Sequence, residues 1–351
     1  MESRDGALEP RILQFIRHHL SVEPEPDCLH KLSGDASTRQ YFRYQPDQEL
    51  SFIVTLYPEP FDPARFAYHQ VYELMRKIDI PVPHILSLDG RLGIVMQQDL
   101  GDGSLERIFS DAPEALRGRL LQRACQHILR LQQAGPSVLQ QQPRFSNPSF
   151  TVEKFVWELR FFHEHYLTGH RGRHVSFTNE LDREFVILAE KLASLPKRLC
   201  HRDYHVRNLM LNQDRLYVID FQDTRWGPPT YDLASLLKDS IQLQPRETEA
   251  LIDLFLKAMD WEVDAEEFKH HFHLTCIQRL LKALGTYGYQ IAVRHQERYQ
   301  NYVAGSLRRL HDSLHLVSEF PCIRRLVKGE VESHWSVGTH HTPSVHHDRH
   351  H

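Results

Sequence analysis

The stretch HRDYHVRNLM, residues 201–210, is followed closely by YVIDFQD, residues 217–223. It places Asp203 five residues before Asn208, and the following apolar strand ends at Asp220. If the two strands form a hairpin, Asn208 and Asp220 come close enough to share a hard cation. Amide and carboxylate oxygens suit Mg²⁺, which also binds substrate phosphates. The sequence therefore predicts a metal–phosphate site, with Asp203 left to accept the proton of an attacking hydroxyl.

The composition is that of a globular protein. The chain has 351 residues, of which 41% are hydrophobic and 25% charged, enough for one large domain or two lobes. The formal net charge of -4 provides no electrostatic footprint for nucleic acid and no polybasic membrane patch. No apolar run approaches the roughly 18–20 residues of a transmembrane helix. We expect no nucleic-acid or membrane partner, and the oligomeric state stays open.

The cysteines and the N-terminal residues favour the cytoplasm, and the C-terminal residues are interpreted separately. The N-terminus, MESRDGALEP, carries both charge signs and lacks the apolar stretch of a signal peptide. The C-terminal residues 331–351 are rich in histidine and lack apolar periodicity, so we interpret them as a disordered tail rather than a metal-scavenging segment. The five cysteines are odd in number, scattered and without a CxxC, which predicts reduced thiols: Cys28, Cys125, Cys200, Cys276 and Cys322.

The N-terminal third is predicted to form a small antiparallel sheet with one inserted helix, after a leading helix over residues 8–20. The inserted helix covers residues 61–78, with Asp62 as N-cap and Pro63 at its first position. A hairpin over residues 84–96 has a two-residue turn of Asp89 and Gly90. The extended segments before the helix are 28–32, 39–44 and 50–57.

After about residue 103, helical periodicity dominates, interrupted by the strand–turn–strand pattern NLML-NQD-RLYVID of residues 208–220. We predict an α+β, bilobal fold with a nucleotide-binding lobe (1–97) and a helical catalytic and acceptor-binding lobe (98–330), joined by a connector near Gln97 to Gly103. A cleft between two lobes favours a small-molecule site. The predicted helices are 113–133, 151–168, 180–194, 230–240, 246–260, 266–291 and 296–316.

HRDYHVRNLML and VIDFQD resemble the catalytic loop and metal-binding strand of the protein-kinase-like fold. The form is that of the aminoglycoside phosphotransferase and choline kinase superfamily, in which the loop runs H-x-D-x-x-x-x-N and the metal-binding Asp is not followed by Phe-Gly. Within that superfamily, GDAS and DFQDTRWGPPTYDLASLLKD resemble the bacterial anomeric kinases of N-acetylmuramate and N-acetylglucosamine. The likeness spans about residues 30–310.

The resemblance implies a kinase that uses ATP and Mg²⁺, with Asp203 as base and Asn208 and Asp220 as metal ligands. Asp232 matches a buried structural aspartate. Asp223 is either a further metal ligand or an ordinary loop carboxylate, and His201 is expected to pack within the loop. The nucleotide is expected at a tight turn and at the connector, whose candidate residues are Gly34, Ala36, Ser37, Thr38 and Arg39, then Gln97, Gln98, Asp99 and Leu100.

The phosphate-side cation departs from the pattern of protein kinases, which place a lysine on a strand of the small lobe. No lysine occurs between Lys31 and Lys77. Arg39 is the candidate substitute, and a solvent-facing strand arginine is the alternative. Without a lysine, the role of Glu73, which matches that lysine's usual partner by position, is in doubt. The anomeric sugar kinases share this departure, so the missing lysine does not imply an inactive protein.

The acceptor is predicted to be a small molecule, because Asp232 follows Asp220 by only twelve positions, a segment too short to hold a polypeptide. Residues 268–328 contain ten Lys or Arg and three Asp or Glu, which disfavours a polycation such as an aminoglycoside. Three readings stay open: a sugar kinase, an aminoglycoside kinase and a non-catalytic nucleotide-binding scaffold. The candidate acceptor contacts, against ordinary helix packing, are Glu158 with its neighbour Trp157, then Arg279, Lys282 and Tyr287.

Overall fold

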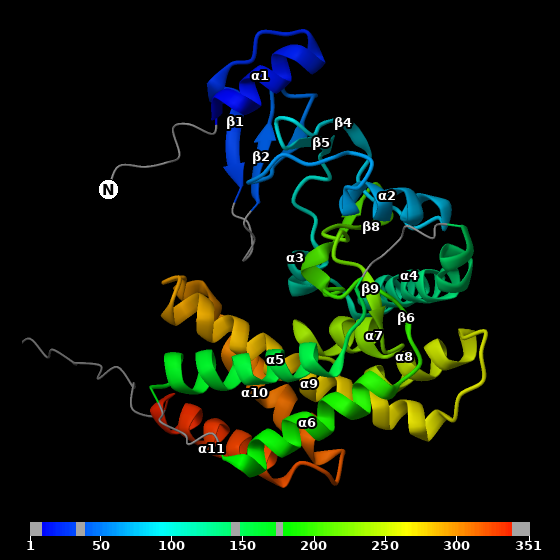
Figure 1. Cartoon of the computed structure of the whole chain (residues 1–351), viewed down its shortest axis with the longest axis vertical. Coiled ribbons are helices and arrows are strands. Elements are labelled where there is room, and N and C mark those ends of the chain that lie inside the picture. Colours follow the sequence, from blue (N-terminus) through cyan, green and yellow to red (C-terminus); the bar gives the residue numbers. More distant parts are fainter. Residues whose placement is uncertain (1–8, 33–38, 142–147, 173–177, 339–351) are drawn as a thin grey trace, which may run out of the picture. The chain divides into compact units, whose positions relative to one another are not determined.

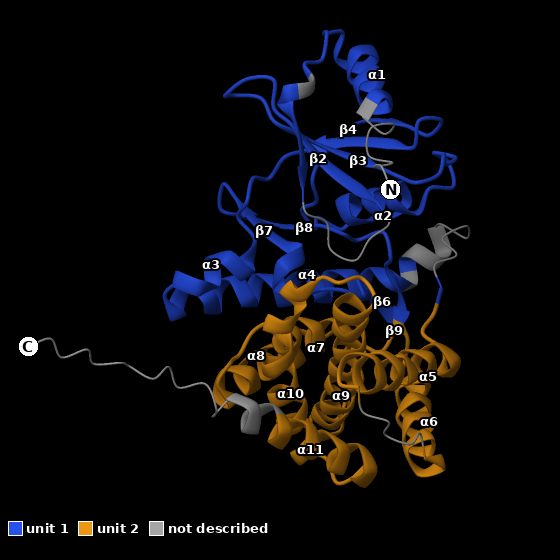
Figure 2. Ribbon diagram, turned by 90° about the vertical axis from the view of Figure 1, so that its left-hand side faces the viewer, with its two compact units in different colours: residues 1–148, 198–226 blue, residues 149–197, 227–351 orange. Residues whose placement is uncertain are grey.

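The computed structural model describes residues 9–32, 39–141, 148–172 and 178–338. It divides into two compact units, coloured separately in Figure 2. The first comprises Met1–Pro148 and Arg198–Trp226, and the second comprises Ser149–Lys197 and Gly227–His351. This division differs from the predicted lobes, because the segment with HRDYHVRNLM and YVIDFQD belongs to the same unit as the N-terminal sheet.

Within its described residues, the first unit contains an antiparallel sheet of order β1-β2-β3-β5-β4. Apolar side chains on one face of the sheet, such as Val54 and Met96, pack against Ile12, Phe15 and Ile16 of α1. Figure 1 shows α1 (Glu9–Leu20) beside these strands. The extended segments and the mixed fold class predicted from the sequence are confirmed. The strands are β1 (Leu29–Leu32), β2 (Gln40–Tyr44), β3 (Phe52–Leu56), β4 (Ile85–Asp89) and β5 (Ile94–Gln98).

The inserted helix begins later than predicted. Helix α2 (Ala67–Lys77) has Phe66 as its N-cap, in an extended conformation. The Asp62 carboxylate instead accepts a hydrogen bond from the backbone N–H of Ala64 at 3.0 Å, so it closes a separate turn. The predicted cap at Asp62 was therefore wrong: its side chain satisfies the local backbone before the helix starts.

The β4–β5 connection is wider than the predicted two-residue turn. Asp89 pairs with Ile94 across the strands, so four residues connect them. The Asp89 carboxylate accepts hydrogen bonds from the N–H groups of Arg91 and Leu92, at 2.8 and 3.0 Å. Gly93 takes the left-handed conformation, with φ +66°. The aspartate stabilises the loop from inside, and a glycine three residues later than predicted supplies the positive φ.

The predicted strand–turn–strand over residues 208–220 is confirmed. Strands β7 (Leu209–Asn212) and β8 (Arg215–Val218) pair through Asn212 and Arg215. Gln213 and Asp214 between them have φ of +47° and +58°, the two positive values of a type I′ turn. The rest of the first unit consists of η2 (Pro26–Cys28), α3 (Leu105–Asp111), α4 (Glu114–Gln141), β6 (Arg198–Cys200), η4 (Val206–Asn208) and β9 (Arg225–Gly227), whose last residue lies in the second unit.

The described part of the second unit is helical. Most predicted helices are present. The structure also has a helix that was not predicted, α11, which continues to Gly338. The interpretation of residues 331–338 as a disordered tail was therefore wrong, and residues 339–351 lie outside the described residues. The elements are α5 (Val152–Phe161), the π-helix η3 (Phe162–His170), α6 (Asn179–Ser194), α7 (Tyr231–Ala234), the π-helix η5 (Ser235–Asp239), α8 (Pro245–Ala258), α9 (Ala265–Ala292), η6 (Glu297–Tyr299), α10 (Gln300–His315) and α11 (Pro321–Gly338).

Two glycines let α9 approach η3 closely. A Cβ added to Gly285 would lie 2.8 Å from the Cα of Phe162, and one added to Gly288 would lie 2.4 Å from the carbonyl oxygen of His165. Both neighbours are backbone atoms, which cannot move aside as a side chain can. The glycines of the segment QRLLKALGTYGY therefore serve helix packing.

We expect Gly288→Ala to destabilise the protein by about 1–3 kcal/mol, because the added methyl forces α9 away from η3. Gly329→Ala in α11 is the matched control, since a Cβ there meets no atom within 4 Å. The control should be neutral or slightly stabilising, because alanine favours a helix over glycine. Thermal unfolding of the two variants provides the test, and equal melting temperatures would contradict the packing role.

Candidate active site

The β7–β8 hairpin brings Asn208 beside the segment that ends in Asp220. The backbone N–H of Ile219 donates to the carbonyl of Asn208 at 3.0 Å, next to the Leu209–Val218 pair of the ladder. The side chain of His201 is buried, and its Nε2 lies 3.0 Å from the carbonyl oxygen of Ile219. The predicted packing of His201 within the loop is confirmed, and it ties the start of the loop to the segment that ends in Asp220.

Asn208 also orders the loop that carries Asp203. The side-chain Nδ2 of Asn208 donates to the carbonyl of Asp203 at 2.8 Å. That bond uses the amide nitrogen and leaves Oδ1, which accepts no hydrogen bond from a described residue. The preceding residue, Arg202, has a φ of +86°, a strained value for a residue with a side chain. The loop is thus held in one conformation by a side-chain amide and a strained backbone.

The carboxylate of Asp203 shares a cation with that of Asp223. Arg202 Nε lies 3.7 Å from Asp203 Oδ2, and Arg202 Nη1 lies 3.4 Å from Asp223 Oδ2. The side chain of Asp203 is 27% exposed, so it is within reach of a bound molecule. Asp223 was read as either a metal ligand or a loop carboxylate, and the ion pair with Arg202 favours the second.

Asp220 leaves its strand in a left-handed conformation, with φ +59°. Its Oδ1 accepts hydrogen bonds from Gln222 Nε2 at 2.8 Å and from Arg39 Nη2 at 3.2 Å. The next residue, Phe221, is fully buried and stacks on Tyr68 of α2, with ring centroids 4.7 Å apart. The side chain of Asp220 is 37% exposed, whereas the ring of the next residue is fully buried. Backbone strain of this kind is concentrated at functional sites.

These groups fit a magnesium ion. Asn208 Oδ1 and Asp220 Oδ2 accept no hydrogen bond from a described residue, and an amide plus a carboxylate oxygen form a hard donor set. Among the described residues there is no group of three or more His, Cys, Asp and Glu suited to a metal ion. Mg²⁺ usually takes one or two protein oxygens and completes its shell with water and phosphate, so two ligands suffice.

Arg39 is not a solvent-facing strand arginine. Its side chain is 15% exposed and pairs with Asp220 at 3.2 Å. Burial alone would lower the pKa of Arg39, but Tyr41, Asp220 and Tyr57 together raise it above its usual value. The guanidinium is therefore a permanent charge beside the candidate metal ligand. Gly34, Ala36, Ser37 and Thr38, the other candidates at the turn, lie outside the described residues.

The connector uses its side chains to hold itself in place. The hydroxyl of Tyr68 donates to Gln97 Oε1, and the N–H of His84 donates to Gln98 Oε1 at 3.3 Å. The carbonyl of Leu100 accepts a hydrogen bond from Asn212 at 3.2 Å. These contacts fix the connector against α2 and the β7–β8 hairpin, and adenine binding by its backbone stays a prediction.

Asp99 of the connector is held by the small sheet. Its carboxylate accepts hydrogen bonds from Arg43 Nε at 2.6 Å and from Ser51 Oγ at 2.5 Å. Burial by itself raises the pKa of Asp99, but the bonds from Arg43, Ser51 and the Gly101 N–H outweigh it and lower that pKa. Arg43 and Arg39 therefore have separate carboxylate partners. Glu73 of α2 makes no ion pair with any described residue, which agrees with the missing lysine.

Two of the five acceptor candidates are engaged within the second unit. The side chain of Arg279 is 2% exposed, forms an ion pair with Asp239 and lies 4.5 Å from the ring centre of Tyr231. Glu158 is equally buried, accepts a hydrogen bond from Gln278 at 2.8 Å and pairs with Lys154 at 3.3 Å. These contacts favour structural roles, and a sugar contact by either residue has no support from the structure.

The other three acceptor candidates, Tyr287, Lys282 and Trp157, differ in how far their side chains are exposed. Tyr287 is buried against the rings of Tyr299 and Tyr302, with centroids 5.9 and 5.6 Å away, which favours packing. Lys282 is half-buried. Trp157 is 55% exposed, with the ammonium of Lys154 4.0 Å from its ring centre, so it stays a candidate platform for a sugar ring. Asp232 is fully buried at the start of α7, as expected of a structural aspartate.

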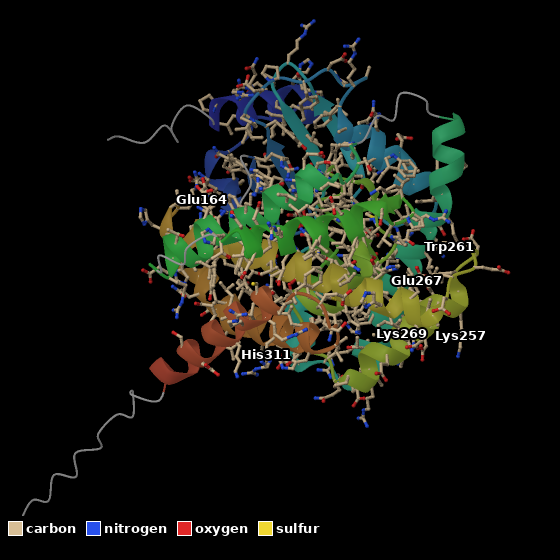
Figure 3. All side chains as sticks on the ribbon, turned by 60° about the horizontal axis from the view of Figure 1, so that its bottom comes forward. Glu164, Lys257, Trp261, Glu267, Lys269 and His311 are labelled. Atoms are coloured by element: carbon tan, nitrogen blue, oxygen red, sulfur yellow. The ribbon has the colours of Figure 1, made fainter. Side chains whose placement is uncertain are left out.

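The basic residues of the second unit are partly neutralised. Lys269 of α9 lies 3.3 Å from Asp253 of α8, and Figure 3 labels Lys269 together with Glu267 of the same helix. Arg279 is paired with Asp239, and Lys328 lies 3.9 Å from Glu332. The sequence argument from ten basic residues against a polycationic acceptor is therefore weaker than the count indicates.

Sequence reasoning missed the residues that support the site. Arg202, Gln222 and Tyr68 were not singled out, although each contacts Asp203, Asp220 or Phe221. The positive φ values of Arg202 and Asp220 could not be predicted from the residue types at these positions. One signal was available: Gln222 is two residues after Asp220, in reach of its carboxylate. Tyr68 comes from a distant helix, and no local pattern connects it with Phe221.

Residues 29–266 match the sequence profile of the phosphotransferase enzyme family, and the chain belongs to that family. The match includes the loop of Asp203 and the strand of Asp220. An N-acetylmuramate/N-acetylglucosamine kinase of Neisseria meningitidis serogroup B is 31% identical over 280 residues, 76% of this chain and 80% of that protein. A protein of the same name from Pseudomonas aeruginosa is 29% identical over 288 residues, 76% of this chain and 77% of that one.

Solved structures of other kinases share the fold. A choline/ethanolamine kinase family protein from Mesorhizobium loti matches with a TM-score of 0.58 at 14% identity, over 93% of this chain and 99% of that one. The GDP complex of an aminoglycoside 2′-phosphotransferase matches with a TM-score of 0.59, also at 14% identity, over 88% of this chain and 97% of that one. At such identities the likeness defines the fold alone, which is the predicted protein-kinase-like fold.

Proposed function

We propose that this protein transfers the γ-phosphate of ATP to the anomeric hydroxyl of an N-acetylated amino sugar, N-acetylmuramate or N-acetylglucosamine. The observation that carries the kinase reaction is the arrangement of Asp203, Asn208 and Asp220 around one hairpin. The names of the relatives, at 29–31% identity over three quarters of the chain, support the acceptor. Membership of the phosphotransferase family disfavours the reading of a non-catalytic scaffold.

Each group has a defined task in this proposal. Asp203 orients the acceptor hydroxyl and takes its proton as the oxygen attacks phosphorus. Asn208 Oδ1 and Asp220 Oδ2 would hold Mg²⁺, which neutralises charge on the phosphates when bound. Asn208 serves twice, because its Nδ2 fixes the backbone of Asp203. An anomeric hydroxyl is more acidic than other sugar hydroxyls, so one carboxylate suffices as its base.

The cellular setting is part of the proposal. The five cysteines, all within described segments, are free thiols. None of the described helices has the length and apolar character needed to span a bilayer. A kinase that consumes ATP and has reduced thiols fits the cytoplasm, where ATP is available and thiols stay reduced.

Phosphorus NMR of the product tests the acceptor. With N-acetylmuramate or N-acetylglucosamine and MgATP, we expect a phosphate signal coupled to the anomeric proton. The 1-O-methyl glycoside of N-acetylglucosamine is the matched control, since its anomeric oxygen is blocked, and it should not be turned over. Kanamycin and choline are assayed in parallel. Phosphate on the 6-hydroxyl, or turnover with kanamycin or choline alone, would falsify the proposed acceptor.

A further inference from the structure

The first unit contains a cavity of about 320 Å³ that the proposed reaction does not use. Its walls come from α2, from residues between 79 and 84, and from β8. Figures 1 and 2 show α2 beside β8. The backbone N–H of Val218 donates to the carbonyl of Pro81 at 2.8 Å, so two of these walls are bonded to each other. None of the described residues proposed as base or metal ligands lines the cavity.

The cavity has an excess of positive charge. Arg76, in the last turn of α2, and Arg215, the first residue of β8, both line it and are exposed to a ligand. Neither guanidinium has an acidic group of a described residue within ion-pair distance. Asp79 is the only acidic residue of the described lining, and its carboxylate lies 3.5 Å from Arg130 of α4. The charges of Arg76 and Arg215 are therefore available to an anion.

The two guanidinium groups are positioned by aromatic rings of their own elements. Arg76 lies over the ring of Tyr72, 5.7 Å from its centre, and Arg215 lies over the ring of Tyr217 at 5.8 Å. Both tyrosines also line the cavity. A cation–π contact orients a guanidinium without neutralising its charge. The arginines are thus partly ordered before any ligand binds, which lowers the entropic cost of binding.

Two neutral side chains of the lining add further hydrogen-bond donors. The hydroxyl of Tyr72 accepts from the N–H of Ile85 at 3.4 Å and lies 2.9 Å from His84 Nδ1, to which it can donate its own hydrogen. A neutral His84 then carries its proton on Nε2. The amide oxygen of Gln98 accepts from the N–H of His84 at 3.3 Å, which leaves the NH₂ group of Gln98 to donate. The lining therefore favours a ligand with several acceptor oxygens.

We propose that this cavity binds a small phosphate ester, such as a sugar phosphate, at a site separate from the active site. A phosphate group supplies three acceptor oxygens and about two negative charges, and a guanidinium binds it through parallel hydrogen bonds. Arg76 and Arg215 bind the phosphate. Ligand pockets occupy about 300–1,000 Å³, so this cavity suits a molecule with a single ring. Pro81 and Tyr217 provide apolar surface for that ring.

Calorimetry with ribose 5-phosphate, in the absence of ATP, tests the site. This ester lacks the acetamido group, so it is neither substrate nor product of the proposed reaction. The double variant Arg76→Gln/Arg215→Gln should bind it at least about tenfold more weakly than the wild type, the factor for one lost charge-assisted hydrogen bond. Asp220→Asn should keep the wild-type affinity, because its carboxylate belongs to the candidate metal site. Ribose and inorganic phosphate should each bind more weakly than the ester.

The double variant Arg65→Gln/Arg91→Gln is the matched control, because it removes the same charge from the first unit. Both arginines are exposed and neither lines the cavity, so this control should bind the ester as the wild type does. Equal weakening in the two double variants would assign binding to general electrostatic attraction and overturn the proposal. Loss of binding in Asp220→Asn, or affinity for inorganic phosphate equal to that for the ester, would also overturn it. A failed kinase assay leaves this test unaffected, since no turnover is measured.

Discussion

Replacing Asp203 by asparagine is expected to lower kcat by roughly 10²–10⁴-fold, the usual contribution of a general base. The carboxylate is partly exposed at the end of a loop that Asn208 and His201 fix in place. The asparagine amide has almost the same shape but accepts no proton from the sugar. ATP binding, measured by calorimetry, and the melting temperature should change little, because asparagine fills the same space and Asn208 still holds the backbone carbonyl of residue 203.

Asp223→Asn is the matched control for Asp203→Asn. The Asp203 variant loses both the base and a carboxylate near Arg202, whereas the Asp223 variant loses only a carboxylate near Arg202. Asp223 lies closer to Arg202 than Asp203 does, at 3.4 against 3.7 Å, so the substitution disturbs the arginine at least as much. We expect less than a tenfold change in kcat from it. Near-full turnover by Asp203→Asn would place the base elsewhere, and equal losses in both variants would assign the effect to Arg202.

The sequence predicted the elements in which local pattern and tertiary structure agree. The hairpin of residues 208–220 has a turn segment, NQD, whose Gln213 and Asp214 both take positive φ. Its strands are apolar, and the site residues at its ends follow from their register. The kinase-like loop was predictable because its chemistry needs certain residue types at fixed spacing.

The helix start was mispredicted because distant residues override a local cap signal. Asp62 and Pro63 have the types that begin a helix, yet Phe61 donates its N–H to the carbonyl of Gly90 at 2.8 Å and its ring stacks on Phe66 at 3.8 Å. These contacts hold residues 61–66 against the β4–β5 turn and delay the helix to Ala67. Nothing within residues 61–78 indicates that partner.

Partners far apart in the chain account for the other errors. Helix α11 continues past residue 330 because Glu330 is buried in an ion pair with Arg171, at 3.0 Å, and Arg171 also donates to Ser333 at 2.9 Å. Arg279 was grouped with Lys282 by helical spacing, but its partner is Asp239, forty residues earlier. A sequence shows the residue type and its neighbours, and it does not show which distant carboxylate neutralises a buried arginine.

Replacing Asp220 by asparagine is expected to abolish most of the Mg²⁺-dependent turnover. Loss of a metal ligand removes several kcal/mol of charge stabilisation on the phosphates, which corresponds to a decrease of at least about 10²-fold. Asparagine is preferable to alanine here, because Asp220 has a φ of +59° and asparagine tolerates that conformation better. The neutral side chain keeps the shape of the site while removing the charge that binds the metal ion.

Asp214→Asn is the matched control for this substitution. Asp214 has nearly the same backbone conformation, with φ +58°, and its carboxylate also pairs with an arginine, Arg123, at 3.1 Å. It lies in the turn of the β7–β8 hairpin and not at the strand end that carries Asp220. Magnesium titrations of kcat should therefore distinguish the two variants, while their melting temperatures stay close to that of the wild type. An Mg²⁺ dependence unchanged by Asp220→Asn would remove Asp220 from the metal site.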